Sequence, residues 1–342
     1  MSLDANIAWK VAKNRKKIVV IGGGTGTYTV LTGLKKFPAE LSAIVSMMDS
    51  GGSNRVIRDE FGLLPTSDIR QGMVALASDK SHEVLRNLFT YRYNQGTGIS
   101  GMTFGNLFMA ALTDIYGSQE KAIEKTCEVL DVQGQVIPVT YDSVQLVARY
   151  ESGQQVLGEH FIDEPAADVG KEKIIDLEVI PKAKGNPKAL SAIKSADLII
   201  LGPGDLYTSI ICNLVVDGVA DALVKSKAKK VFVMNLMTKF GETGGLSAKD
   251  HLETLKKYLK GGAIDFILVN ETKEYPAGVL KRYKLERAEP VIDDIKSEDG
   301  LKVVRGNYIS NQVFQKPTSD KVRRSLIRHD SDKLAKAIIS LL

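Results

Sequence analysis

The chain has 342 residues, of which 44% are hydrophobic and 25% charged, a composition typical of a folded globular protein. The formal net charge of +5 is mild for this length, and no basic stripe interleaved with aromatic residues favours a nucleic acid. No apolar run approaches the ~20 residues of a membrane span. We therefore expect neither a nucleic acid nor a membrane as a partner.

Two cysteines, Cys127 and Cys212, are too few and too far apart in sequence for a disulfide framework, so a cytoplasmic location is expected. No signal-peptide pattern opens the chain. Residues 1–16 lack hydrophobic periodicity, and we interpret them as a disordered tail or cloning remnant. Residues 17–342 are then expected to form a single domain.

The first predicted strand, 17–21, is aliphatic and runs directly into a glycine turn, with a helix expected over 27–37. A strand, a glycine turn and a helix N-terminus together present free N–H groups to an anion, most often a phosphate. The pattern matches neither a strict dinucleotide fingerprint nor a P-loop, and a turn that merely packs tightly is the alternative. The candidate ligand-binding residues are Gly22, Gly23, Gly24, Thr25 and Gly26.

A second strand, 41–48, leads into an acidic residue and another glycine-rich loop. In doubly wound folds an acidic residue at this place contacts a ribose. Asp49 could bind such a ligand or a metal, and it could instead cap the following turn. The candidate ligand-binding residues of this loop are Asp49, Ser50, Gly51, Gly52 and Ser53.

The next expected helix begins near residue 67 and runs to about 78. Asp68 suits the first turn of this helix on electrostatic grounds, whereas the fork of Arg70 is suited to a phosphate or carboxylate; both are candidates. Helices are also expected over 81–93, 104–116 and 119–130. A loop of glycines and hydroxyls before the second of these is either a lid or phosphate loop or a plain connector, and Gly105 and Asn106 at its end are candidates.

Residues 135–139, 144–150 and 155–161 alternate or run apolar, and we expect a small antiparallel β insertion within 135–180. A helix over 187–195 leads back to a buried strand at 197–201. This strand is followed by a second glycine turn, which would meet the first at the carboxyl edge of a parallel sheet. Its candidate residues are Gly202, Pro203, Gly204, Tyr207 and Thr208.

Strands at 230–234 and 264–269, a short strand at 290–292 and a helix over 331–342 complete the prediction, with a Ser247–Asp250 capping box between the first two strands. Asn235 and Thr238, after the strand at 230–234, are further candidates.

Alternating strands and helices predict an α/β fold with a three-layer, Rossmann-like, mostly parallel sheet. A basic cluster at Lys321, Arg323, Arg324 and Arg328 is interpreted as a solvated face.

Recognised catalytic patterns are missing from the sequence. The four histidines show no zinc-site spacing, there is no CxxC, and no Gly-x-Ser-x-Gly elbow anchors a hydrolase triad. Any catalysis would therefore use carboxylates such as Asp49 with a metal or bound phosphates. The catalytic residues are unknown, and an NAD-dependent enzyme is the weakest hypothesis because it rests on fold analogy alone.

The chain resembles the CofD/YvcK family, and within it the YvcK group, called gluconeogenesis factors. Seven motifs in the family's order carry this resemblance, at 21–26, 49–53, 67–70, 105–107, 201–209, 235–238 and 241–243. The resemblance implies a CofD-like, Rossmann-type fold that holds a nucleotide at the edge where these motifs lie.

The YvcK resemblance implies a cytoplasmic protein that binds UDP-sugars such as UDP-N-acetylglucosamine and supports cell shape and wall synthesis during gluconeogenic growth. It favours a non-catalytic protein, and it leaves room for a homo-oligomer and for a cell-wall enzyme or regulatory partner. The alternative is a CofD-type transferase that moves a phospholactyl-type group from a GDP carrier to a deazaflavin with magnesium. Family members usually pair two aspartates where this chain has Asp49 and Ser50, which weakens that alternative.

Overall fold

The structure is a computed structural model, and it describes residues 15–78, 83–276, 278–297, 300–313 and 325–342. Most of the expected tail at 1–16 lies outside the described residues, as do Lys321, Arg323 and Arg324 of the basic cluster. Lys16 does not belong to a tail, because it is the first residue of a strand. No helix in these described ranges is long and apolar enough to cross a membrane.

Seven parallel strands form the main sheet, in the order β3-β2-β1-β7-β8-β9-β10. The strands that follow β1 in the chain, β2 and β3, lie on one side of it, and the later strands β7 to β10 lie on the other side. The boundary between β1 and β7 is therefore the switch point at which doubly wound folds bind ligands. The strands are β1 (Lys16–Gly22), β2 (Ala39–Val45), β3 (Gln135–Pro138), β7 (Leu198–Leu201), β8 (Lys229–Val233), β9 (Phe266–Asn270) and β10 (Lys302–Gly306).

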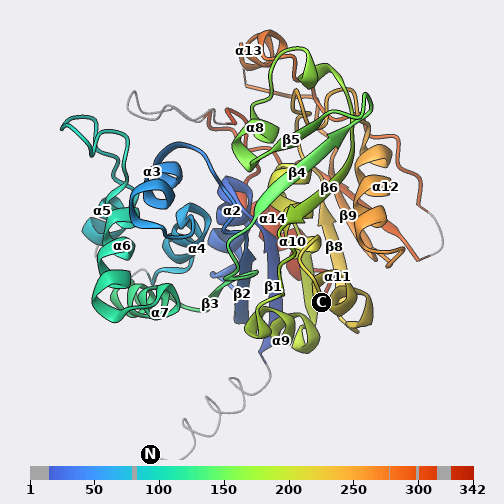
Figure 1. The fold of residues 1–342 in the computed structure, drawn as a ribbon. Coiled ribbons are helices and arrows are strands. Elements are labelled where there is room, and N and C mark those ends of the chain that lie inside the picture. The colour runs from blue at the N-terminus through green and yellow to red at the C-terminus, as the bar shows by residue number, and fades with distance from the viewer. Residues whose placement is uncertain (1–14, 79–82, 277, 298–299, 314–324) are drawn as a thin grey trace, which may run out of the picture.

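Side chains of the sheet alternate between two buried faces, as expected for a doubly covered parallel sheet. Ile18 and Val20 pack with α2 (Gly24–Leu34), α4 (Ser67–Leu76), α7 (Gln119–Val129) and α14 (Ser331–Ile339). Val19 and Ile21 pack on the other side with α9 (Pro187–Ser195), α11 (Val219–Lys225) and α12 (Ala248–Tyr258). The three-layer Rossmann-like prediction is confirmed (Figure 1).

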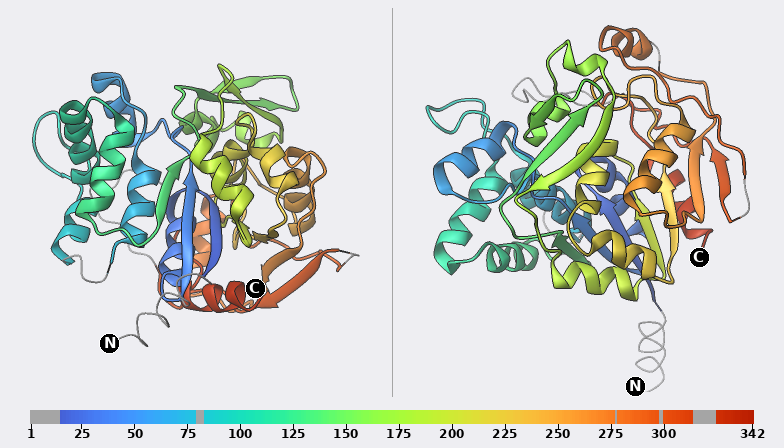
Figure 2. Two further views of the ribbon diagram at one scale, coloured as in Figure 1. Left: turned by 90° about the horizontal axis from the view of Figure 1, so that it is seen from below. Right: turned by 45° about the vertical axis from the view of Figure 1, so that its right-hand side comes forward.

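Further helices extend the molecule beyond the β3 edge of the sheet, where three views show them gathered beside α7 (Figure 1, Figure 2). They are α3 (Gly52–Phe61), α5 (Glu83–Thr90) and α6 (Phe104–Tyr116). Short helical elements complete the described chain: α8 (Glu159–Asp163), η1 (Val169–Lys171), the π-helix η2 (Leu206–Ile211), α10 (Cys212–Leu214) and α13 (Val279–Leu285).

The predicted antiparallel insertion exists but is smaller than expected. Its sheet has the order β5-β4-β6, made of β4 (Gln145–Tyr150), β5 (Gln155–Leu157) and β6 (Ile174–Ile180). The run at 135–139, which was assigned to the insertion, instead supplies β3 and pairs in parallel with β2. The insertion also carries α8, which the sequence did not reveal.

Several other expectations need correction. The helix after the first glycine turn begins at Gly24 and not near residue 27, so Gly24, Thr25 and Gly26 form its first turn. The second glycine loop is likewise the start of a helix, α3. The strand expected at 290–292 is a single bridge between Met237 and Pro290, and the strand β10 was missed. The Ser247–Asp250 capping box is confirmed.

Candidate functional site

The two glycine turns touch at the switch point of the sheet. A Cβ atom added to Gly26 would lie 1.9 Å from the carbonyl oxygen of Pro203, so only glycine permits this approach. The loop after β8 stabilises the second turn, because the N–H of Gly204 donates to Asn235 Oδ1 at 3.1 Å. The loops after β1, β7 and β8 therefore converge on the N-terminus of α2.

A carboxylate already lies at the N-terminus of α2. The N–H of Gly24 donates to Asp68 Oδ1 at 2.9 Å, and a Cβ on Gly23 would come within 2.3 Å of Asp68 Oδ2. Thr25 and Gly26 follow at the next two helical positions, where an N–H group has no acceptor within its own helix. Their N–H groups are the natural donors for a further anion.

Two neighbouring cavities flank this helix terminus. The first, which we call the α8 cavity, measures about 310 Å³ and extends toward α3, α4 and α8. The second, which we call the α13 cavity, measures about 150 Å³ and extends toward β8 and α13. Both cavities are lined by Thr25, Gly26, Gly204, Asp205, Lys239 and Ser325. One elongated ligand could therefore contact the helix terminus and both sides at once.

Asp49 lines the α8 cavity, and it also organises the backbone around it. Its Oδ1 accepts from the N–H of Gly51 at 2.9 Å, the capping geometry expected of an aspartate before glycine. Its Oδ2 accepts from Asn54 Nδ2 at 2.6 Å. The capping role is therefore present, while the place of Asp49 in the cavity wall leaves a ligand contact as a proposal.

Arg70 is directed into the protein rather than displayed on the surface. It is 6% exposed, and it donates to Asn106 Oδ1 at 3.0 Å and to the carbonyl of Phe89 at 3.2 Å. Asn106 is fully buried and donates in turn to Ser53 and Asn54, both at 3.2 Å. The network thus links α4, α5 and α6 to the start of α3 and, through Asn54, to Asp49.

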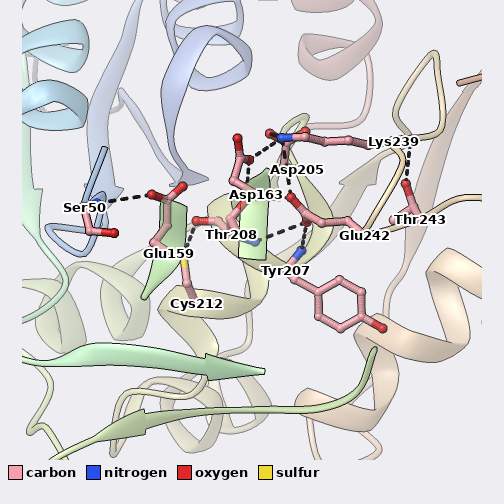
Figure 3. A network of polar contacts seen from close by, with 10 residues as sticks. All are labelled: Ser50, Glu159, Asp163, Asp205, Tyr207, Thr208, Cys212, Lys239, Glu242 and Thr243. Atoms are coloured by element: carbon pink, nitrogen blue, oxygen red, sulfur yellow. Dashed lines mark hydrogen bonds and ion pairs between the residues drawn. The ribbon is translucent and has the colours of Figure 1, made fainter. Parts of the chain in front are cut away.

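Lys239, a partly buried lysine in the wall of the α8 cavity, lies among three carboxylates (Figure 3). Lys239 Nζ contacts Asp163 of α8, Asp205 Oδ2 at 2.8 Å and Glu242 Oε1 at 3.5 Å. Glu242 also accepts from the N–H of Tyr207 at 3.0 Å and from the hydroxyl of Thr208 at 2.9 Å. Segments distant in the sequence are therefore joined by one charged cluster.

This cluster perturbs the protonation of its members. Burial raises the pKa of Glu242 to about 8 despite the opposing effect of Lys239, and burial also raises the pKa of Asp205. Burial lowers the pKa of Lys239, but the nearby carboxylates of Asp205, Asp163 and Glu242 raise it overall, well above its usual value. Oxygens of the three carboxylates lie within 4.8 Å of one another, as metal ligands would, and the ammonium of Lys239 supplies a positive charge among them.

A second carboxylate pair lies where α8 meets the loop after β2. Glu159 Oε2 accepts from the N–H of Ser50 at 3.2 Å, and the hydroxyl of Ser50 accepts from the N–H of His160 at 3.0 Å. Burial, followed by the charges of Asp49 and Asp163, raises the pKa of Glu159 well above its usual value. Like charge therefore gathers where α8 faces the loop after β2.

A model of the family described as 2-phospho-L-lactate transferase CofD matches residues 18–309. The chain belongs to this family. The match includes both glycine turns and the Lys239 cluster, and only the part of the cavity walls near Ser325 lies beyond it.

Individual relatives agree with this membership of the CofD family. A Thermotoga maritima protein whose name contains gluconeogenesis factor is 42% identical over 330 residues, covering 94% of this chain and 98% of that protein. The gluconeogenesis factor of Bacillus subtilis is 36% identical, covering 96% of this chain and 98% of its own length. A crystal structure of a Bacillus halodurans protein superimposes with a TM-score of 0.85 at 36% identity, covering 95% of this chain and 100% of that one.

Most of the candidate residues predicted from sequence line one or both cavities. Those in the walls are Gly23, Gly24, Thr25, Gly26, Asp49, Gly51, Gly52, Ser53, Asp68, Arg70, Pro203, Gly204, Thr208, Asn235 and Thr238. The other six candidates lie behind these walls: Gly22, Ser50, Gly105, Asn106, Gly202 and Tyr207. The candidate residues are therefore concentrated around these two cavities, and their role in binding stays a prediction.

Packing explains several of the six. A Cβ on Gly105 would lie 2.5 Å from Arg70 Cδ and 2.8 Å from the carbonyl of Phe89. The ring of Tyr207 points away from the charged cluster (Figure 3), and its hydroxyl donates to the carbonyl of Ile174 at 3.0 Å. Tyr207 therefore anchors η2 against the antiparallel sheet, and only its N–H group takes part in the network.

Sequence reasoning found Asp49, Asp68 and Arg70 but missed the other charged groups in and beside the α8 cavity. Asp205 and Glu242 lie inside motifs that were recognised, but no role was assigned to either. Lys239 follows Thr238 directly and has no local feature that reveals its partners. Glu159 and Asp163 belong to a five-residue helix that is too short to produce a periodic signal.

Proposed function

We propose that this protein binds a nucleotide sugar of the UDP-N-acetylglucosamine type at the switch point of its sheet. One observation carries the proposal: the glycine turns after β1 and β7 meet at the N-terminus of α2, between two cavities. Helix N-termini and glycine turns of this kind are suited to phosphates. Open α/β sheets bind their ligands at this place.

In the proposed complex the diphosphate accepts hydrogen bonds from the N–H groups of Thr25 and Gly26. Asp49 accepts a hydrogen bond from a ribose or sugar hydroxyl on one side of the helix terminus. On the other side, Asn235 and Thr238 line the α13 cavity and supply further polar contacts. Lys239 lines both cavities and adds a positive charge there.

Magnesium belongs to the proposal as a companion of the diphosphate. Asp49 and the other carboxylates that line the α8 cavity offer the hard oxygen ligands that magnesium prefers. A bound magnesium ion would neutralise phosphate charge facing these carboxylates.

The role proposed for this binding is regulatory. Relatives covering nearly the whole chain carry the name gluconeogenesis factor, which supports a part in gluconeogenic growth. The part in cell shape and wall synthesis that we propose with it comes from the resemblance to the YvcK group. The free thiols of Cys127 and Cys212 fit a reducing cytoplasm. A cell-wall enzyme or regulatory protein, or a second copy of the chain, would transmit the signal.

A thermal-shift series with UDP-N-acetylglucosamine, UDP-glucose, GDP and NAD, each with and without magnesium, tests the proposal. A ligand at ~100 times its Kd should stabilise the protein by about 2.7 kcal/mol. We expect a rise in Tm with the UDP-sugars and none with NAD. No rise with either UDP-sugar would contradict the proposal.

The same series tests the second candidate function. The matching family model is described as a transferase, and the α8 cavity holds carboxylates that could face magnesium. A shift with GDP that requires magnesium, and no shift with UDP-sugars, would favour a CofD-type transferase acting on a GDP-linked phospholactyl group. Asp49→Ala should then abolish transfer, whereas in a binding protein it should only weaken affinity.

A further inference from the structure

The helix α8 forms a wall of the α8 cavity and is held in place from two directions. Glu159, His160, Asp163 and Glu164, at the helix and just after it, all line the cavity. Ser50 holds one end through Glu159. The hydroxyl of Thr208 donates to Asp163 Oδ1 at 3.4 Å at the other end, beside Lys239. The antiparallel sheet thus carries a fixed row of polar groups to the cavity.

Negative charge dominates this wall. Six carboxylates line the α8 cavity, against three permanently cationic side chains; the carboxylates are Asp49, Asp68, Glu159, Asp163, Glu164 and Asp205, and the cations are Arg70, Arg92 and Lys239. Lys239 is already shared between Asp163 and Asp205, and it also contacts Glu242. A ligand group entering here meets hydrogen-bond acceptors in a field of negative charge.

The α13 cavity has a different chemical character. Its wall contains Leu236, Met237, Ala288 and Ile327 together with the aromatic ring of Tyr283. Such a surface suits the flat, largely apolar face of a heterocyclic base. The carboxylates of the α8 cavity suit hydroxyl groups instead, since an ionised carboxylate can only accept hydrogen bonds. A nucleotide sugar whose diphosphate lies at Thr25 and Gly26 would therefore place its sugar beneath α8.

From this arrangement we infer that the α8 cavity selects the sugar by charge, taking a neutral, hydroxyl-bearing sugar and rejecting a sugar acid. The inference rests on the proposed function, and it adds the class of sugar and the residues that discriminate. Glu164 is the main discriminator, because it lines the cavity directly after Asp163 at the end of α8 and its carboxylate is exposed to an entering ligand. A carboxylate on the ligand would bring like charge into this cluster without being able to donate a hydrogen bond to it.

UDP-glucose and UDP-glucuronate provide the test. They differ at one position of the sugar, where UDP-glucose has a hydroxymethyl group and UDP-glucuronate has a carboxylate. Isothermal titration at pH 7.5, in the same buffer and magnesium concentration, should give a Kd for UDP-glucuronate at least tenfold higher than for UDP-glucose. Equal affinities, or tighter binding of the acid, would overturn the inference while leaving the proposed function standing. Binding of neither would overturn both.

A pair of variants assigns the discrimination to the cavity. Glu164→Gln keeps the length of the side chain but removes one charge from the cavity wall, so the ratio of the two Kd values should fall severalfold. Glu178→Gln removes the same charge from an exposed position on β6 of the same antiparallel sheet, and its ratio should equal that of the wild type. An unchanged ratio in Glu164→Gln, or an equal fall in both variants, would overturn the assignment to the α8 wall.

Discussion

The N–H of Gly24 donates a hydrogen bond of 2.9 Å to Asp68 Oδ1, so a carboxylate of α4 lies at the N-terminus of α2. Asp68 was expected to interact favourably with the first turn of its own helix, and it also interacts with the first turn of another. This contact ties the glycine turn after β1 to α4. It also places a negative charge beside the N–H groups that we propose to bind the diphosphate.

Removing this acceptor should destabilise the protein. Asp68→Ala should lower the free energy of unfolding by about 1–3 kcal/mol, because the part-buried N–H of Gly24 loses its acceptor. Asp68→Asn retains an amide oxygen and should lose much less. Urea denaturation of the three proteins measures the difference, and equal losses in the two variants would show that the hydrogen bond is not the source of the stability.

Asp68→Asn should also change ligand affinity. In magnesium-free buffer, loss of a negative charge close to the proposed diphosphate site should tighten the binding of a UDP-sugar severalfold, as expected for ~1 kcal/mol of repulsion between charges near 4 Å in water. Titration calorimetry with UDP-N-acetylglucosamine measures this effect. An unchanged or weaker affinity would place the diphosphate elsewhere.

Contact between the two glycine turns can be tested by adding one methyl group. Gly26→Ala would force its Cβ against the carbonyl oxygen of Pro203, at 1.9 Å in the present geometry. We expect a loss of about 1–3 kcal/mol in the free energy of unfolding, or more, because the backbone must shift. Differential scanning calorimetry would record this as a lower Tm.

Gly244→Ala is the matched control for that substitution. Gly244 is exposed, and the nearest atom to its added Cβ is the carbonyl oxygen of Lys239 at 3.9 Å, an ordinary contact. Its stability should stay within about 0.5 kcal/mol of the wild type. If Gly26→Ala is equally harmless, the two turns do not approach each other as described.

The buried Glu242 should give the protein a pH-dependent stability. Burial raises its pKa to about 8, above the ordinary value of 4.5, so the folded state holds a proton that the unfolded state releases. The stability linked to this proton is fully present below about pH 4.5 and is lost as the pH rises to about 8. Glu242→Gln removes the titration.

The measurement is the free energy of unfolding at several pH values between 5 and 8.5. The free energy of unfolding of Glu242→Gln should increase relative to that of the wild type as the pH rises. Glu178→Gln, which changes an exposed carboxylate, should run parallel to the wild type. Parallel curves for all three proteins would show that Glu242 titrates normally.

Local sequence pattern was enough to predict much of this fold. Helix α9 was predicted with its observed bounds, because Pro187 starts it and its apolar positions recur at the helical period. The buried strand β7 was equally clear. The start of α2 was placed too late because Gly24 and Gly26 have low helix propensity, although glycine is tolerated in a first turn.

The remaining errors concern contacts that depend on distant partners. Val136 and Ile137 are both buried, as in a central strand, but their nearness in sequence to β4 suggested a hairpin. The strand β10 is short and partly exposed at the sheet edge, so it gave little apolar signal. In the site, Asp163 and Lys239 are 76 residues apart, and no local pattern joins them.

Hydrogen–deuterium exchange with and without UDP-N-acetylglucosamine tests the central claim most directly, because it reports both binding and location. We predict slower amide exchange in two segments together, residues 23–29 and 203–209, with smaller protection near Asp49 and α8. Protection confined to another surface, such as the groove beside β2, β3 and α9 at the opposite edge of the sheet, would contradict the account. So would unchanged exchange throughout the chain at a ligand concentration that saturates binding.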